Sequence, residues 1–200
     1  MVVLEGGEGC GKSTQAVRLA QRLGALLTRE PGGTPMGERI RSLVLDPASA
    51  GLVARAEALL MAAARAQHVA EVVAPALAAG RHVVSDRFTG SSLAYQGYGR
   101  GLSVDELRLL SSFATGGLEP DLVVLLELDA AVVARRRDRQ PDRVEAAGPE
   151  FHRRVGEGFA ALASADAERW VRVDGEGSED EVADRVWAAL TARLGDPAGW

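Results

Sequence analysis

Lysine is nearly absent from this 200-residue chain, although basic residues are common. Of its 23 lysine and arginine residues, only Lys12 is a lysine. Asparagine is missing altogether, and Ile40 is the only isoleucine. All three amino acids have A/T-rich codons, so a G+C-rich coding sequence accounts for the shortage. The position at which the one lysine remains is therefore informative.

Cysteine and long apolar runs are also scarce. The single cysteine, Cys10, excludes an internal disulfide and suits a reducing compartment. The longest apolar stretch, near Leu122–Leu128, is too short to span a bilayer, and Met1–Glu5 lack the basic and apolar regions of a signal peptide. We therefore expect a cytoplasmic protein that does not act at a membrane.

The size and the net charge of the chain further limit the class of protein and the kind of ligand. A length of 200 residues, with 46% of them hydrophobic, suits one compact domain that spans residues 1–200. The formal charge of −5 argues against a nucleic-acid polymer as the partner. A small phosphorylated ligand is still compatible with this charge, because a few clustered arginines suffice to bind one.

Short apolar runs alternate along the chain with longer helical patterns. Runs that are apolar on both faces indicate strands buried between helices, as in a parallel sheet. The alternation predicts an α/β fold, a three-layer αβα sandwich with a five-stranded parallel sheet. Pro75 is expected to kink or end the third helix. The expected strands lie at 2–4, 26–28, 81–86, 121–128 and 170–173, and the expected helices at 12–23, 36–46, 53–79, 103–114, 130–138, 150–167 and 178–193.

A phosphate-binding loop follows the first expected strand. Residues 6–13 read Gly-Gly-Glu-Gly-Cys-Gly-Lys-Ser and fit the P-loop pattern G-x-x-x-x-G-K-[ST]. Its glycines let backbone N–H groups approach phosphates, and the helix that follows adds its positive end. The Lys12 ammonium would reach the β and γ phosphates, and the Ser13 hydroxyl would ligate Mg²⁺. Arginine cannot replace this compact charge, which explains why one lysine persists.

A P-loop alone is compatible with a kinase, a GTPase, a motor or a ligase. A guanine-binding Asn-Lys-x-Asp motif is excluded, since the chain has no asparagine and no second lysine. Arginines are dense on the predicted loops, and phosphoryl transfer between two anionic substrates requires such positive charge. These arginines are Arg29, Arg41, Arg65, Arg87, Arg100 and the run at 135–143, which would form a short lid at about 136–149.

Each of these features also has a plain structural interpretation. The basic run could be a solvated helix end, and the pair Asp86-Arg87 could be an ordinary ion pair at the end of a strand. Cys10 is expected to fill a variable loop position, because no histidine nearby would activate it. The three histidines, His68, His82 and His152, are expected to be packing or surface residues.

Several further motifs occur in a fixed order along the chain. The most specific are Thr-Arg-Glu-Pro-Gly-Gly at 28–33 and Ala-Tyr-Gln-Gly at 94–97; the others lie at 5–14, 40–45, 56–60, 64–65, 85–88, 99–101, 120–122 and 142–145. With these motifs the chain resembles the thymidylate kinases, a family of P-loop nucleoside-monophosphate kinases, from about residue 2 to residue 190. The resemblance implies transfer of the ATP γ-phosphoryl group to dTMP, giving dTDP and ADP, with Mg²⁺ as cofactor and a homodimer as the assembly.

The resemblance also assigns the site residues. It implies that ATP is bound by Gly6, Gly7, Glu8, Gly9, Cys10, Gly11, Lys12, Ser13 and Thr14, and that Ser13 and Asp86 serve the metal. The substrate dTMP would be bound by Glu30, Arg41, Met61, Arg65, Arg87, Ser92, Tyr95 and Gln96. The catalytic set would be Lys12, Glu8, Arg87 and two lid arginines, for which Arg139 and Arg143 are favoured.

Individual roles follow from the same resemblance. Arg41 and Arg87 would hold the dTMP phosphate, and Arg65 would donate to a thymine carbonyl. Ser92 and Gln96 would contact the base or sugar, and Tyr95 would crowd the 2′ position and reject ribonucleotides; Glu8 would approach the 3′-hydroxyl. The family usually has phenylalanine where this chain has Met61, which could instead be an ordinary core residue.

Two other functions stay open at this point. One is a kinase of the same architecture with another nucleoside or nucleotide as acceptor. The other is a regulatory protein that binds a nucleotide without turning it over. A panel of acceptors separates both from a dTMP kinase.

The lone lysine provides an independent test of the loop. Amine acylation can label only Lys12 and the N-terminus, because no other primary amine exists in the chain. We expect MgATP to protect Lys12 selectively, as read by mass spectrometry, because the bound phosphates would surround its ammonium. The N-terminus is the internal control, and equal labelling of Lys12 with and without MgATP would contradict the loop assignment.

Overall fold

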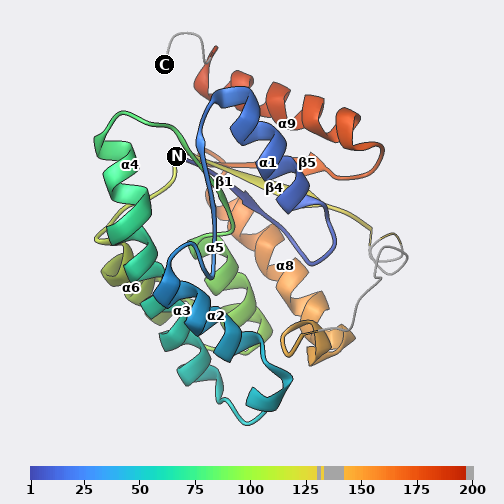
Figure 1. The fold of residues 1–200 in the computed structure, drawn as a ribbon. Helices are drawn as coiled ribbons and strands as arrows, with labels where there is room; N and C mark the ends of the chain where they lie inside the picture. The colour runs from blue at the N-terminus through green and yellow to red at the C-terminus, as the bar shows by residue number, and fades with distance from the viewer. Residues whose placement is uncertain (130–131, 133–141, 197–200) are drawn as a thin grey trace.

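Five parallel strands form the centre of the protein (Figure 1). The computed structural model describes residues 1–129, 132 and 142–196. The strand order is β2-β3-β1-β4-β5, and every neighbouring pair is parallel. This arrangement confirms the predicted five-stranded parallel sheet. The strands are β1 (Val2–Glu5), β2 (Leu26–Arg29), β3 (Val83–Asp86), β4 (Leu122–Glu127) and β5 (Trp170–Asp174).

Helices cover both faces of this sheet, with α1 and α9 together on one face. The helices of the described part are α1 (Lys12–Leu23), α2 (Pro35–Leu45), α3 (Ala54–His68), α4 (Ala74–Ala78), α5 (Thr89–Ser92), α6 (Val104–Thr115), α8 (Pro149–Ala165) and α9 (Glu179–Leu194). Two π-helical segments, η2 (Val69–Val73) and η3 (Leu93–Gly99), and two short 3₁₀ turns, η1 (Pro47–Ser49) and η4 (Glu145–Ala147), complete the set.

The central strand β1 shows why the strands are apolar on both faces. Val2 and Leu4 belong to the core formed with α1 and α9, whereas Val3 belongs to the core on the opposite face, with Val73 of η2. All four side chains are buried. Successive residues of a strand point to opposite faces. A strand that lies between two helical layers therefore needs apolar residues on both faces, and only its last residue, the buried Glu5, is an exception in β1.

Two helical regions differ from the sequence-based expectation. The single helix expected at 53–79 is divided into α3, η2 and α4, and Pro75 lies in the first turn of α4, where its missing N–H matters least. No helix was expected at 89–99, where the structure has α5 and η3. Gly90 and Gly99 are needed there for close packing, since a Cβ would lie 2.7 Å from Trp170 and 2.5 Å from Phe151, respectively.

The remaining expected helices agree with the structure, apart from the one expected at 130–138. That helix lies outside the described residues, except for residue 132. Among the described residues, none of the helices combines the length and apolar character that a membrane span requires.

The topology brings three loops to one edge of the sheet. Strands β2, β3 and β1 are adjacent and parallel, so their carboxyl ends lie side by side. The register pairs Asp86 of β3 with Leu4 on one side and with Arg29 on the other. The P-loop after β1, the Asp86-Arg87 pair and the Arg29-Glu30 pair therefore meet at this edge, where open α/β sheets bind ligands.

Candidate active site

The P-loop connects β1 to α1 and has the backbone that its glycines permit. Gly6 has a φ of +147°, and a Cβ there would lie 2.5 Å from the carbonyl oxygen of Leu126. Gly11 is left-handed, with a φ of +90°, and α1 begins at the next residue. The buried Lys12 side chain donates from Nζ to the Gly7 carbonyl at 2.9 Å. The loop therefore combines a helix N-terminus with one enclosed ammonium group, which suits a polyphosphate.

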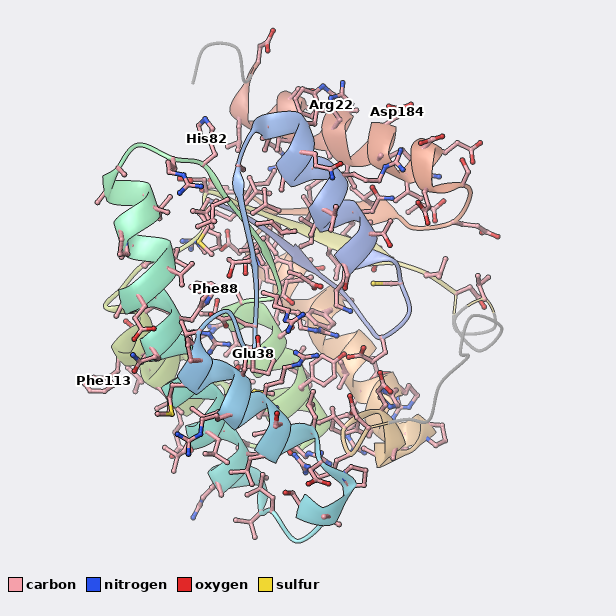
Figure 2. The ribbon with its side chains drawn as sticks, in the orientation of Figure 1. Arg22, Glu38, His82, Phe88, Phe113 and Asp184 are labelled. Atoms are coloured by element: carbon pink, nitrogen blue, oxygen red, sulfur yellow. The ribbon has the colours of Figure 1, made fainter. Side chains whose placement is uncertain are left out.

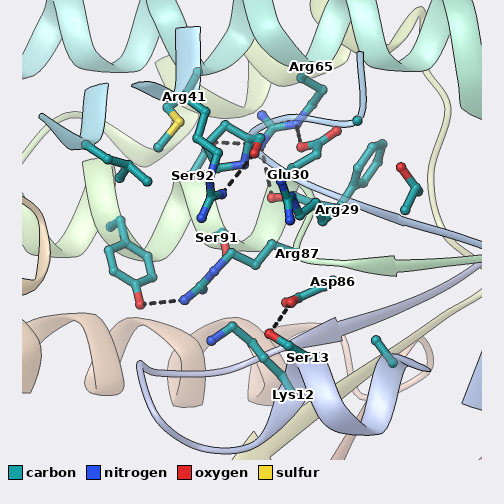
Figure 3. A pocket seen from close by; sticks show the side chains of 18 of the residues that line it. Lys12, Ser13, Arg29, Glu30, Arg41, Arg65, Asp86, Arg87, Ser91 and Ser92 are labelled. Carbon is teal, nitrogen blue, oxygen red and sulfur yellow. Dashed lines mark hydrogen bonds and ion pairs between the residues drawn. The ribbon is translucent and has the colours of Figure 1, made fainter. Parts of the chain in front are cut away.

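Ser13 and Asp86 form an oxygen-rich corner beside this loop. The Ser13 hydroxyl donates to Asp86 Oδ2 at 2.5 Å, a contact that Figure 3 shows. The second carboxylate oxygen, Oδ1, is buried and has no hydrogen-bond partner among the described protein atoms. No group of three or more His, Cys, Asp or Glu side chains that could hold a metal occurs among the described residues. One carboxylate and one hydroxyl fit Mg²⁺, which takes its other ligands from water and phosphates.

Arg87 lies opposite the P-loop, directly after β3. Its φ of 74° makes it the one non-glycine residue with positive φ in the part of the chain that the structure describes. Its guanidinium donates to the Gly6 carbonyl at 3.1 Å, to Ser91 Oγ at 3.0 Å and to the Tyr95 hydroxyl at 3.1 Å, and it also pairs with the Glu8 carboxylate. Strained backbone of this kind is concentrated at functional sites. Arg87 thus bridges the P-loop and the helical segment η3.

The charge state of Glu8 depends on this bridge. Burial opposes its ionisation, but the positive charges of Arg87 and Lys12 outweigh burial and lower the Glu8 pKa to about 2. Burial raises the pKa of the Tyr95 hydroxyl well above its usual value, so this group stays protonated and donates to Glu8 at 2.9 Å. At neutral pH the site therefore holds an ionised Glu8 between two cations.

A second buried acid, Glu5, shapes the loop after β3. Its carboxylate accepts the backbone N–H groups of Phe88 at 3.0 Å and Ser91 at 2.9 Å, and the Ser91 hydroxyl at 2.6 Å. Burial raises the Glu5 pKa. The sequence analysis did not assign Glu5 to the site, although an acid at the end of the buried run Val2–Leu4 was a usable signal.

The far side of the cavity is organised around Glu30, which accepts from Arg65 Nε at 2.7 Å and interacts with His68 Nδ1 at 2.9 Å. Arg65 also donates a hydrogen bond from Nη2 to Ser92 Oγ at 2.9 Å. His68 is fully buried and also contacts the Thr28 hydroxyl at 2.6 Å, which agrees with a packing role. Glu30 therefore holds Arg65 in place through one carboxylate oxygen, and the contact of its other oxygen with His68 fixes Glu30 itself.

A further buried acid, Glu57 of α3, accepts hydrogen bonds from side chains of two other parts of the chain. Its carboxylate accepts from Gln96 Nε2 at 2.8 Å, from Arg100 Nη2 at 3.1 Å and from Arg143 Nη2 at 2.6 Å. Arg143 also donates from Nε to the Val44 carbonyl at 2.6 Å. The structure thus places Arg143, one of the two favoured lid arginines, in a buried ion pair. The other, Arg139, lies outside the described residues.

Many of the side chains described above line one cavity of about 680 Å³. Figure 3 shows Arg29, Arg41 and Arg87 facing it from three different elements. Burial and the neighbouring charge of Arg29 lower the pKa of the Arg41 guanidinium, so a ligand anion here would relieve repulsion. The lining includes these residues that the sequence analysis assigned to the site: Glu8, Lys12, Ser13, Glu30, Arg41, Met61, Arg65, Asp86, Arg87, Ser92, Tyr95 and Gln96.

Other residues assigned from the sequence do not line this cavity. They are Gly6, Gly7, Gly9, Cys10, Gly11 and Thr14 of the P-loop region, and Arg143. Cys10 is buried in the core between the sheet and α1, which agrees with its expected filling role. Conversely, Arg29 and Ser91 line the cavity without having been assigned.

A parallel sheet with a P-loop at its edge, facing an arginine-lined cavity, defines a P-loop kinase of small phosphorylated substrates. Comparison with known proteins gives the family. The thymidylate kinase family model matches residues 4–186. A thymidylate kinase of a Synechococcus strain is 52% identical over 200 residues, covering 96% of both chains, and that of Deinococcus radiodurans is 50% identical over 199 residues, again covering 96% of both.

A solved structure agrees with the sequence relatives. The crystal structure of thymidylate kinase from Ehrlichia chaffeensis superimposes with a TM-score of 0.80 at 29% identity, covering 95% of this chain and 97% of that one. The chain belongs to the thymidylate kinase family. The resemblance inferred from the motifs is confirmed, and so is the kinase activity that it implied.

The low pKa of Glu8 predicts a pH dependence of stability. Because its folded pKa of about 2 lies below the ordinary 4.5, ionised Glu8 stabilises the fold above pH 4.5, and this contribution is lost as pH falls toward 2. We expect Glu8→Gln to lower the free energy of unfolding at neutral pH and to flatten its acid dependence, measured by urea denaturation. The matched control is Glu168→Gln on the exposed surface. An unchanged acid dependence in Glu8→Gln would contradict the pairing with Arg87.

Proposed function

We propose that this chain transfers the γ-phosphoryl group of ATP to dTMP, giving ADP and dTDP, in the cavity between the P-loop and Arg87. The single observation that carries the proposal is the position of the arginines. A polyphosphate loop and a cluster of cations for a second anion open on the same cavity. Family membership supports dTMP as that second anion.

On the ATP side, the P-loop backbone, Lys12 and the start of α1 would bind the phosphates, and residues 6–14 would enclose them. Ser13 and Asp86 would hold Mg²⁺, because both supply oxygen atoms and Asp86 Oδ1 has no hydrogen-bond partner in the part of the chain that the structure describes. When bound, the metal ion would neutralise developing charge on the phosphate oxygens. The ammonium of Lys12, already enclosed by the loop, would add a positive charge at the transferred group.

On the acceptor side, Arg41 and Arg87 would hold the dTMP phosphate, and Glu8 would accept the sugar 3′-hydroxyl. An acceptor phosphate is anionic at neutral pH, so the reaction needs no strong general base. Arg87 and Glu8 form an ion pair whose side chains are 12% and 24% exposed, respectively. Both are therefore accessible enough to exchange contacts with a ligand. Catalysis would come from positioning and charge.

The base would lie between α3 and the segment formed by α5 and η3. Arg65 and Ser92 are in contact there, and Met61 and Gln96 line the same part of the cavity. The buried Tyr95 ring lies beside Arg87 and would exclude a 2′-hydroxyl. Met61 would pack its thioether on the base in place of the usual phenylalanine.

The lid assignment changes in one respect. Because Arg143 is held by Glu57 and Val44, we propose that it fixes the base of the lid, and that Arg139 supplies the transition-state charge. Residues 1–200 would act as one kinase domain, with the lid at about 136–149. The single cysteine and the nucleotide substrates support the cytoplasm as its compartment, without a role for a membrane or a nucleic-acid polymer.

An acceptor panel tests the reaction. We expect the purified protein with ATP and Mg²⁺ to phosphorylate dTMP with a kcat/KM higher than for the other nucleoside monophosphates, measured by ADP release and by chromatography of the product. Arg87→Met should lose most of this activity, because the acceptor phosphate loses its clamp, while Arg172→Met on the exposed edge of β5 should retain it. Preference for another acceptor would identify a different kinase, and ATP binding without turnover would identify a regulatory protein.

We also propose a homodimer formed through α3 and α6, which pack side by side. Leu109 and Phe113 of α6 are 74% and 86% exposed, and Leu59 of α3 is 59% exposed. Figure 2 shows Phe113 projecting away from the body of the protein. Apolar side chains gathered in this way on neighbouring helices are typical of a protein interface.

Light scattering checks the dimer. We expect wild-type protein to have the mass of two 21.0 kDa chains and Phe113→Glu to dissociate toward one, because a charge would be buried at the interface. The control, Ala188→Glu on the exposed side of α9, should leave the mass unchanged. A wild-type mass of a single chain would contradict the proposed dimer.

A further inference from the structure

Glu57 is fully buried, yet the reaction as proposed gives it no contact with either substrate. Its carboxylate accepts from one neutral amide, that of Gln96, and from two guanidinium groups, those of Arg100 and Arg143. The three donors come from η3, from the residue after η3 and from the expected lid, to which Arg143 belongs. A buried acid with this set of partners calls for a functional explanation, because burying a charge is costly even when it is paired.

The carboxylate of Glu57 is ionised. Burial opposes ionisation, but the hydrogen bond from Gln96 and the contacts with Arg143 and Arg100 together lower the Glu57 pKa. An ionised carboxylate can only accept hydrogen bonds, and the two ends of a glutamine amide differ only in that one donates and the other accepts. Gln96 must therefore turn its NH₂ group toward Glu57. The alternative orientation would place two oxygen atoms against each other.

Gln96 and Glu57 form one of two contacts that join α3 to the segment formed by α5 and η3. At one end, Arg65 of α3 donates to Ser92 of α5; at the other, Gln96 of η3 donates to Glu57 of α3. Met61 lies between Glu57 and Arg65 on α3, because the three are spaced by four residues. Gln96 and Met61 both line the cavity. The space beside Met61 thus has a guanidinium at one end and the Gln96 amide at the other.

The orientation of this amide decides which ring it accepts. With the NH₂ group taken by Glu57, Gln96 offers the ligand its carbonyl oxygen, which requires an N–H donor. A thymine or uracil ring carries N–H at N3, next to carbonyl groups that suit Arg65. A cytosine ring has an unprotonated N3 that is itself an acceptor. We infer that Glu57 is a positioning residue for base selectivity, which fixes the Gln96 amide so that the cavity selects pyrimidines with N–H at ring position 3.

This inference rests on the proposed function, and one set of kinetic measurements separates the two. The quantity to measure is the ratio of kcat/KM for dTMP to kcat/KM for dCMP. Wild-type turnover of dTMP tests the reaction itself; only the ratio in the variants tests Glu57. If wild-type protein does not phosphorylate dTMP, the proposed function fails before Glu57 is considered.

The first variant is Glu57→Gln, which keeps the shape and removes the charge. Its amide can donate to Gln96, so Gln96 can present NH₂ to the ligand instead. We expect the ratio to fall at least about tenfold, with KM for dTMP rising and KM for dCMP falling. The reason is that the Gln96 NH₂ group would then face the N3–H of thymine, another donor, and would pair with the unprotonated N3 of cytosine. If Glu57 only supports the fold, both substrates lose activity equally and the ratio stays at the wild-type value, which would overturn the inference.

A further variant, Gln96→Leu, keeps the inference testable even if Glu57→Gln does not fold. Gln96→Leu should lower the ratio by at least about tenfold, and an unchanged ratio would overturn the inference. In the Gln96→Leu background, adding Glu57→Gln should leave the ratio where it is, because Glu57 acts through Gln96. A further fall in the double variant would show that Glu57 acts by another route.

The matched control is Arg100→Lys. It weakens the pairing of Glu57 while leaving the contact between Glu57 and Gln96 in place. We expect a lower melting temperature and a wild-type ratio. A ratio that follows the melting temperature across all variants would indicate a structural effect and overturn the inference.

Discussion

The contact between Arg87 and the phosphate-binding loop determines how the two sides of the site face each other. The Arg87 backbone N–H donates to the Leu4 carbonyl at 2.9 Å, and its guanidinium reaches Gly6 and Glu8. A positive φ for arginine costs on the order of 1 to 3 kcal/mol, so the surrounding contacts must impose it. Because the same residue binds the loop and faces the cavity, the donor side and the acceptor side are held at a fixed separation. Positioning of this kind is the main requirement of phosphoryl transfer.

Acidic side chains hold the arginines of the site in place. Glu8 pairs with Arg87, Glu30 with Arg65, and Glu57 with Arg100 and Arg143. The pairs of Arg65 with Glu30 and of Arg143 with Glu57 would be costly to break, because the partner left behind would be a buried charge. The arrangement explains how an acidic protein maintains an arginine-lined cavity. The arrangement also gives the two kinds of cation different roles. The arginines are held in ion pairs with carboxylates, while the one lysine supplies a compact charge inside the loop.

Local patterns in the sequence were sufficient for most of the fold and for part of the site. The apolar runs predicted all five strands, and the spacing of glycines and Lys12 predicted the loop and the start of α1. The segment at 89–99 could not be predicted, because its glycines meet Trp170 and Phe151, which are distant in the sequence. The pairings of Glu5, Glu57 and Arg143 were missed for the same reason. An acid in a helix or at the end of a strand has no local signal for the cation that it meets after folding.

The sequence by itself thus determined the class of the protein, the phosphate loop and the family, because these depend on residues that are neighbours along the chain. Only the tertiary structure decided which charges meet. It placed Arg143 against Glu57, oriented the Gln96 amide by the same carboxylate and left Asp86 Oδ1, beside Ser13, without a hydrogen-bond partner among the described residues. The physical reason is packing between elements that are distant in the sequence: the parallel sheet brings the ends of β1, β2 and β3 to one edge, and α3 packs against η3.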